Sequence, residues 1–192
     1  TFTVPVLADS APENNETATM TLSSASNATI SDATGTLTIT DDDSISFTGT
    51  TINQGLSDQA REVFLADMDS DGDLDIVVSS SKDNTVAWFE NDGAANPGFS
   101  HANIATNAKG GADVVVSDMD GDGDLDIVSA SSGDDTIAWY ENDGAANPTW
   151  TAADIATSAN GAYSVDVADM DGDGDLDIVS ASDTDNTIAW YE

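Results

Sequence analysis

The most informative part of this chain is the acidic nonamer Asp118-Met-Asp-Gly-Asp-Gly-Asp-Leu-Asp126. The same nonamer occurs twice more, as Asp67-Met-Asp-Ser-Asp-Gly-Asp-Leu-Asp75 and as Asp169-Met-Asp-Gly-Asp-Gly-Asp-Leu-Asp177. The copies begin at residues 67, 118 and 169, so the interval is 51 residues in both cases. A fixed interval of this length predicts a tandem repeat in which each unit carries one acidic loop.

The nonamer has a carboxylate at every odd position. Numbered from its first residue, it carries Asp at positions 1, 3, 5, 7 and 9, and Gly at position 6. In a tight loop the side chains at positions 1, 3 and 5 can converge on one point, and the Gly permits a sharp turn that aims the carbonyl of residue 7 at the same point. An Asp at position 9 completes the set of oxygen ligands around that point. The sequence therefore predicts a cation site with oxygen ligands only.

Calcium is the cation that fits this set of ligands best. Oxygen atoms suit a hard cation, and neither His nor Cys lies nearby, which disfavours zinc and copper. Mg²⁺ demands a tighter octahedron and usually keeps several waters. Four carboxylates about 5 Å apart repel one another by roughly 5 kcal/mol per loop in water, so we expect metal binding and folding to be coupled. The alternative is a solvated acidic turn without metal, as in a halophilic protein.

The composition limits the partners of the chain. Its 192 residues include 37 acidic and 3 basic ones, which gives a formal net charge of −34. We expect no binding to nucleic acid and no insertion into a membrane, because the charge repels anions and no stretch approaches the roughly 18 apolar residues of a membrane span. Calcium, basic partners and other copies of the chain remain as partners. The chain has no Cys and therefore no disulfides, so bound metal is the cross-link that remains available to a small β-protein.

Short β-prone segments surround each acidic nonamer. One leads into it (62–67, 113–118, 164–169), one leaves it (75–79, 126–130, 177–181), and a third follows a polar turn (85–90, 136–141, 187–192). An aromatic residue opens each unit and is followed five residues later by isoleucine (Phe47 and Ile52, Phe99 and Ile104, Trp150 and Ile155). Four strands in about 50 residues are typical of a propeller blade. We therefore expect three blades, at about 44–98, 99–149 and 150–192.

The pattern Asp-x-Asp-x-Asp-Gly-x-x-Asp between two strands resembles the FG-GAP/VCBS repeats of integrin-type β-propellers. The resemblance covers residues 44–192, and it implies that each loop binds one Ca²⁺ through the side chains at positions 1, 3, 5 and 9 and the carbonyl of position 7. The first set of implied ligands is Asp67, Asp69, Asp71, Asp73 and Asp75. The second set is Asp118, Asp120, Asp122, Asp124 and Asp126. The third set is Asp169, Asp171, Asp173, Asp175 and Asp177.

The N-terminal residues 1–43 form a separate region that is rich in Thr and Ser and ends in Asp41-Asp42-Asp43. Its segments Phe2–Leu7, Glu13–Thr17, Thr21–Ser23 and Gly35–Asp43 resemble the C-terminal half of a Calx-beta domain, which is a β-sandwich. Half a sandwich leaves strand edges unpaired. They are covered either by sequence upstream or by a strand from another copy, and strand donation between copies would build a fibre.

Together these features predict an all-β chain with tandem four-stranded, propeller-type blades, calcium-binding loops and an incomplete β-sandwich at the N-terminus. We expect a non-catalytic structural or adhesive segment of a large secreted or cell-surface protein, since the acidic sites repeat and a reaction needs an asymmetric site. The alternatives are a carbohydrate-binding propeller and an accessory domain of an extracellular enzyme.

Overall fold

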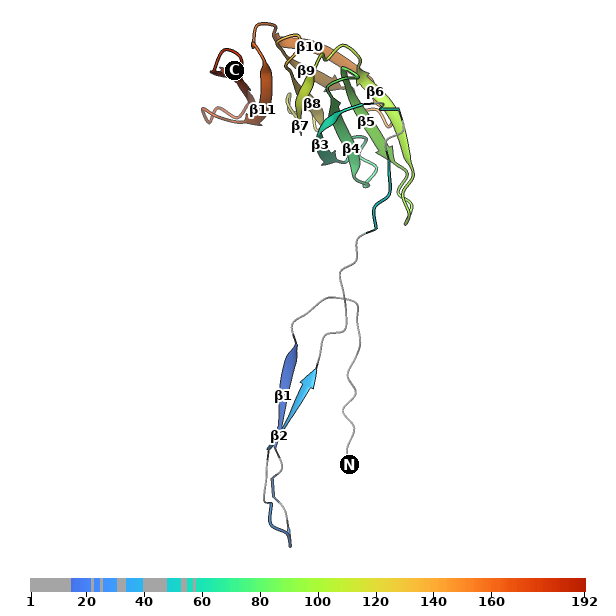
Figure 1. The fold of residues 1–192 in the computed structure, drawn as a ribbon, viewed down its shortest axis with the longest axis vertical. Coiled ribbons are helices and arrows are strands. Elements are labelled where there is room, and N and C mark those ends of the chain that lie inside the picture. The colour runs from blue at the N-terminus through green and yellow to red at the C-terminus, as the bar shows by residue number, and fades with distance from the viewer. Residues whose placement is uncertain are drawn as a thin grey trace. The chain divides into compact units, whose positions relative to one another are not determined.

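The structure, a computed structural model, describes residues 15–21, 23–24, 26–30, 34–39, 48–52, 55–56 and 58–192. Over these residues the chain is all-β, as expected, and it divides between Thr51 and Ile52 into two units (Figure 1). No helix in this part of the chain is long and apolar enough to cross a membrane.

The described residues of the N-terminal unit include an antiparallel hairpin. Strand β1 (Glu16–Thr21) pairs with β2 (Thr34–Ile39), with Glu16 opposite Ile39 and Thr21 opposite Thr34. Most side chains of both strands are exposed. The segment Phe2–Leu7 and the run Asp41–Asp43, both part of the expected half-sandwich, lie outside the described residues.

The second unit contains three antiparallel sheets, and in each of them neighbouring strands follow one another along the chain. Sheet 1 consists of β3 (Ala60–Ala66), β4 (Asp75–Ser80), β5 (Thr85–Asn91) and β6 (Phe99–Ala105). Sheet 2 consists of β7 (Gly111–Ser117), β8 (Asp126–Ser131), β9 (Thr136–Asn142) and β10 (Trp150–Ala156). Sheet 3 consists of β11 (Ala162–Ala168), β12 (Asp177–Ser182) and β13 (Thr187–Tyr191). The expected four-stranded arrangement is thus present in sheets 1 and 2.

The sheets are shifted by one strand relative to the repeat of the sequence. Strand β6, which carries the aromatic residue that opens the second repeat, pairs with β5 of the first repeat, and β10 pairs with β9 in the same way. The last strand of one sheet therefore leads directly into the next sheet. Figure 1 shows the sheets following one another from sheet 1 to sheet 3.

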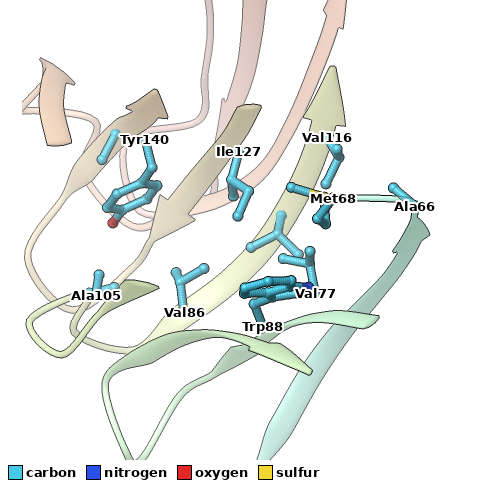
Figure 2. Packing of buried hydrophobic residues seen from close by; sticks show 12 residues of the cluster. Ala66, Met68, Val77, Val86, Trp88, Ala105, Val116, Ile127 and Tyr140 are labelled. Atoms are coloured by element: carbon cyan, nitrogen blue, oxygen red, sulfur yellow. The ribbon is translucent and has the colours of Figure 1, made fainter. Parts of the chain in front are cut away.

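A hydrophobic core lies between sheets 1 and 2. Figure 2 shows Val77, Val86 and Trp88 of sheet 1 facing side chains of sheet 2. The partners that are labelled there are Val116, Ile127 and Tyr140. Val77, Val86 and Ile127 are completely buried. Sheet 2 lies between the other two sheets and is covered on both faces. Every residue of its strand β8 is therefore buried, and the strand does not alternate between apolar and exposed positions.

A second core of the same design joins sheets 2 and 3. Val128, Ala130 and Ile137 of sheet 2 pack with Val165 and Ile178 of sheet 3. Hydrogen bonds accompany this packing: the Asp113 carboxylate accepts from the Ser164 hydroxyl at 2.8 Å and from the Val165 N–H at 3.0 Å. Sheet stacking is therefore repeated, and sheet 2 uses one face toward its predecessor and the other toward its successor.

Candidate metal centre

Each acidic nonamer connects the first and second strands of a sheet. The loops follow β3, β7 and β11 and lead into β4, β8 and β12. Two positions in every loop have a positive φ angle. Position 6 has φ of 99–106° at Gly72, Gly123 and Gly174, which an L side chain would resist. Position 4 has φ of 75° at Gly121 and 82° at Gly172, but 60° at Ser70, the one loop position of this kind without a glycine.

The carboxylate at position 1 organises the turn. In the second loop Asp118 accepts hydrogen bonds from the backbone N–H groups of Gly121 at 2.8 Å and Gly123 at 3.0 Å. Asp169 accepts the equivalent two bonds in the third loop, from Gly172 and Gly174. Asp67 accepts instead from Asp71 and Gly72, both at 3.0 Å. The position-6 glycine thus donates to this carboxylate in all three loops, and in the first loop the second donor is position 5 instead of position 4.

The loops bring carboxylates together in the manner that a cation needs. One oxygen from each of three residues lies within 4.8 Å of the others, and the groups are Asp67, Asp69 and Asp71; Asp118, Asp120 and Asp122; and Asp169, Asp171 and Asp177. A further group in the third loop combines Asp171 and Asp173 with Glu192. Positions 1, 3 and 5 thus meet in the first two loops, and positions 1, 3 and 9 in the third.

The Asp at position 9 is the most buried acid of each loop, with exposed fractions of 0% at Asp75, 1% at Asp126 and 4% at Asp177. Its Oδ2 accepts a hydrogen bond from the N–H of position 2, at 3.1 Å for both Met68 and Met119. Oδ1 of Asp75 and Asp126 accepts from the N–H of a residue 16 positions later, at 2.8 Å. Asp75 and Asp126 are not members of the three-carboxylate groups above, and in these two loops the residue fastens the loop to its sheet.

Burial opposes ionisation of these carboxyl groups. Desolvation raises the pKa of Asp75 and of Asp126, against the hydrogen bonds that favour the carboxylate. Desolvation also raises the pKa of Asp69, and the neighbouring charges of Asp71 and Asp75 raise it further. The protein alone therefore does not compensate the negative charge that it gathers in the loop.

The Asp at position 7 lies apart from the first two three-carboxylate groups. A Cβ placed on Gly93 would collide with Oδ2 of Asp73, and one on Gly144 would collide with Oδ2 of Asp124. The position-7 carboxylates of the first two loops therefore cover the glycine of the turn that follows the third strand. The role expected for this position, a carbonyl ligand, stays a prediction.

Two asparagines that the sequence did not single out hold the first two loops from outside. The side-chain amide of Asn91 donates to the Leu74 carbonyl at 3.0 Å, and Asn142 donates to the Leu125 carbonyl at 3.1 Å. Asn142 also donates to the Met68 carbonyl at 3.0 Å, which ties the loop of sheet 2 to the loop of sheet 1. The recurrence of Glu-Asn-Asp-Gly at the end of the third strand of sheets 1 and 2 was the available signal.

The donor set fits a hard divalent cation. All converging atoms are carboxylate oxygens, which Ca²⁺ prefers. In the first loop Oδ1 of Asp69 is buried and has no hydrogen-bond partner among the described residues. A buried charged acceptor without a partner is costly, and a cation between Asp67, Asp69 and Asp71 would satisfy it. These Asp-rich groups could therefore bind a metal ion and are compatible with Ca²⁺.

Comparison with known proteins agrees with the repeat. The FG-GAP-like repeat matches the chain twice, over residues 67–129 and 118–180, which together are more than half of its length. The match gives no support to the Calx-beta resemblance of the N-terminal region or to the VCBS name. No curated protein matches the chain. With three equivalent loops in stacked antiparallel sheets and two matches to one repeat, the chain belongs to the FG-GAP-like repeat family.

Proposed function

We propose that the chain is a calcium-stabilised, non-catalytic structural or adhesive segment of a secreted or cell-surface protein. FG-GAP-like repeats are typical of extracellular proteins and suggest a β-propeller-like segment of extracellular or adhesion type. The calcium ions, about one per loop, connect the first two strands of every sheet and neutralise part of the charge of −34. Its partners are calcium, further copies of the chain, or molecules of the cell surface or matrix.

The observation that carries the proposal is the convergence of three carboxylate oxygens within 4.8 Å in each of three equivalent loops. A single acidic turn would be ordinary at a protein surface. Three loops with the same backbone geometry, and one with an orphaned buried oxygen at Asp69, support a common ligand of positive charge. Since extracellular modules bind Ca²⁺ with Kd of about 10⁻⁴–10⁻³ M, the millimolar calcium of an extracellular setting would load them.

The absence of a catalytic role is also a proposal, and two observations support it. The acidic groups recur at equivalent places in the three sheets, whereas a reaction needs distinct acid and base positions. His101, the one histidine of the chain, lies with its ring centroid 5.0 Å from that of Phe89, and its Nε2 is buried without a hydrogen bond among the described residues. It is therefore packed against the sheet rather than directed at the acidic loops.

A calcium titration of the chelator-treated chain tests the proposal. Isothermal titration calorimetry should give about three equivalents of Ca²⁺ per chain, each with Kd of roughly 0.1–1 mM. The variant Asp120→Asn removes a charge from the three-carboxylate group of the second loop and should reduce the stoichiometry to about two. Asp154→Asn, an exposed change on β10, is the matched control and should leave all the sites intact. No heat of binding at millimolar calcium would refute the proposal.

A further inference from the structure

The side chain of Asn142 joins the first acidic loop to the second. Asn142 is the last residue of β9 and is 2% exposed. Its amide Nδ2 donates to the Met68 carbonyl in the first loop at 3.0 Å and to the Leu125 carbonyl in the second loop at 3.1 Å. From this contact we propose that Asn142 is a positioning residue that couples the two loops, so that a cation in one raises the cation affinity of the other. The inference rests on the calcium sites of the proposed function.

In the first loop, Asn142 holds the backbone between two of the converging carboxylates. Met68 lies between Asp67 and Asp69, which both belong to the three-carboxylate group of this loop. The N–H of Met68 donates to Oδ2 of Asp75 at 3.1 Å, while its carbonyl accepts from Asn142. Both backbone groups of Met68 are therefore hydrogen-bonded, which fixes the path of the chain between positions 1 and 3.

The side chain of Met68 fixes the same residue from another direction. It is 2% exposed and packs into the core between sheets 1 and 2. Figure 2 shows it in this core together with Val116 and Ile127 of sheet 2. Opening of the first loop around Met68 would therefore disturb apolar packing and a buried hydrogen bond that both lead to sheet 2.

In the second loop, the same asparagine holds the end that enters β8. Leu125, whose carbonyl accepts from Asn142, directly precedes Asp126. The backbone N–H of Asn142 donates to Oδ1 of Asp126 at 2.8 Å, and Oδ2 of Asp126 accepts from the Met119 N–H at 3.1 Å. A continuous series of buried hydrogen bonds thus runs from Met68 in the first loop, through Asn142, to the carboxylate that ties the second loop to its sheet.

The coupling follows from the state in which one open loop leaves the other. Without a cation, the carboxylates of a loop repel one another and favour its opening. If the first loop opens, the Met68 carbonyl moves away and the Asn142 amide keeps a buried N–H without an acceptor, which weakens its hold on the second loop. An ion that closes the first loop restores the acceptor, so the second loop closes at a smaller cost. The effect is reciprocal, as any coupling of two binding equilibria is.

A site-resolved calcium titration of the chelator-treated, 192-residue chain measures the coupling. The N–H groups of Gly72, Gly123 and Gly174 donate to the position-1 carboxylates, so their ¹⁵N NMR signals give one reporter for each loop. Asp69→Asn removes a charge from the three-carboxylate group of the first loop and disables that site. The Gly123 signal should then report a Kd for the second loop that is about three to ten times higher, as the loss of one hydrogen bond implies.

A change in the third loop separates this coupling from general effects of charge and folding. Asp171→Asn makes the same charge change in a loop that is not among the hydrogen-bond partners of Asn142. It should raise the Kd reported by Gly123 clearly less than Asp69→Asn does. The reciprocal variant Asp120→Asn should raise the Kd reported by Gly72 by the same factor that Asp69→Asn produces at Gly123.

Removal of the bridge should remove the coupling. In Asn142→Ala, which leaves the net charge unchanged, Asp69→Asn should affect the Gly123 reporter no more than Asp171→Asn does. Asn142→Ser is a second variant in case the first does not fold. Asn142 also accepts from the Gly144 N–H at 3.0 Å, and a serine hydroxyl can keep that turn, although it is too short to replace the amide between the two loops.

Asn91→Ala is the matched control, because Asn91 ends β5 as Asn142 ends β9 and donates to the Leu74 carbonyl of its own loop at 3.0 Å. It should weaken the first site but leave the effect of Asp69→Asn on the second site in place. If none of the three glycine signals responds to millimolar calcium, the proposed function itself fails. If all three respond but Asp69→Asn and Asp171→Asn act equally on Gly123, or if the difference between them survives in the Asn142 variants, the calcium sites stand and the coupling inference is wrong.

Discussion

Single side chains decide how each acidic loop is closed. Asp126 is almost fully buried and accepts backbone hydrogen bonds from Met119 at 3.1 Å and from Asn142 at 2.8 Å, so one carboxylate joins the loop, the sheet and the following turn. Loss of an aspartate at position 1, 3 or 5 should weaken cation binding, whereas loss of the aspartate at position 9 should break hydrogen bonds between the loop and its sheet. Substitutions at the two kinds of position can separate these roles.

Asp126→Asn should reduce stability even when calcium is saturating. The amide that replaces one oxygen would point an N–H at a backbone N–H, which leaves a buried donor unsatisfied at a cost of about 1–3 kcal/mol. Urea unfolding in millimolar calcium measures this change in the free energy of unfolding. Asp154→Asn, which is exposed on β10, should shift it by less than about 0.5 kcal/mol. Equal effects from the two variants would show that Asp126 is not the fastener.

Ser70 is the residue in which the first loop departs from the others. Its φ of 60° lies in the left-handed region, where a non-glycine residue costs roughly 1–2 kcal/mol. We therefore expect Ser70→Gly to stabilise the first loop and Gly121→Ser to destabilise the second, in each case by about 1 kcal/mol. Thermal unfolding of the two variants in calcium should give shifts of opposite sign, and shifts of the same sign would contradict this interpretation.

At the level of strands and turns, the sequence predicted the recurring strands and acidic loops. It did not predict how the strands of neighbouring repeats pair with one another. The alternation of β-branched and aromatic runs with acidic loops was sufficient to predict the strands around Asp118–Asp126, because those patterns are local. The pairing of β6 with β5 was not evident, since the aromatic residue that opens a repeat hydrogen-bonds backwards to the preceding sheet. The side chains of Asn84 and Asp135 accept hydrogen bonds from the N–H groups of Gly110 and Gly161, and these bonds were also missed, because a turn residue gives no sign of a partner 26 residues away.

In the candidate site too, the sequence predicted the features that arise within one nonamer but not those that depend on other strands. Convergence of positions 1, 3 and 5 follows from the spacing of the side chains in a tight loop, and the structure has it in the first two loops. The fastening of Asp75 and Asp126 depends on amides of other strands, which the spacing within a nonamer does not contain. For the same reason Asn142, whose partner Met68 belongs to another repeat, could not be predicted from one repeat.

The turn after β9 should make the free energy of unfolding depend on pH in the acidic range. The Thr149 hydroxyl and then its N–H, with the Ala145 N–H, donate to Asp143 and hold its pKa below the ordinary value of 3.8. A lowered folded pKa means that this contribution is present above pH 3.8 and is lost as the pH falls through the folded value. Asp143→Asn should therefore lose stability at pH 7, and its difference in free energy of unfolding from the unchanged chain should shrink as the pH falls below 3.8.

The urea midpoints of the two proteins should be measured from pH 7 down into the acidic range. The readout is the difference between the two midpoints at each pH, because acid protonates the carboxylates of the loops in both proteins. A difference that is constant with pH would show that the Asp143 carboxylate does not stabilise the turn.

Two of the hydrophobic cores of the second unit lie between sheets, so we expect its stability to depend on how the sheets stack. Ile137 is fully buried between sheets 2 and 3, whereas Ile188, its equivalent in sheet 3, is 80% exposed. We expect Ile137→Ala to cost about 2–5 kcal/mol and Ile188→Ala less than about 0.5 kcal/mol in dilute, monomeric protein. Chemical unfolding of the pair checks this, and equal losses would mean that sheet 3 does not pack on sheet 2 as described.

Above all, we infer that calcium in the three loops holds this acidic chain together. Thermal unfolding with about 2 mM Ca²⁺, a concentration above the Kd of extracellular-type sites, and again with excess chelator, tests this most directly. Removal of three ions should lower Tm by well over about 10 °C, because each loop adds several kcal/mol of repulsion that binding otherwise offsets. Magnesium at the same concentration should restore little of the loss. Identical unfolding curves with calcium and with chelator would contradict the inference and show that the loops are acidic turns without a structural ion.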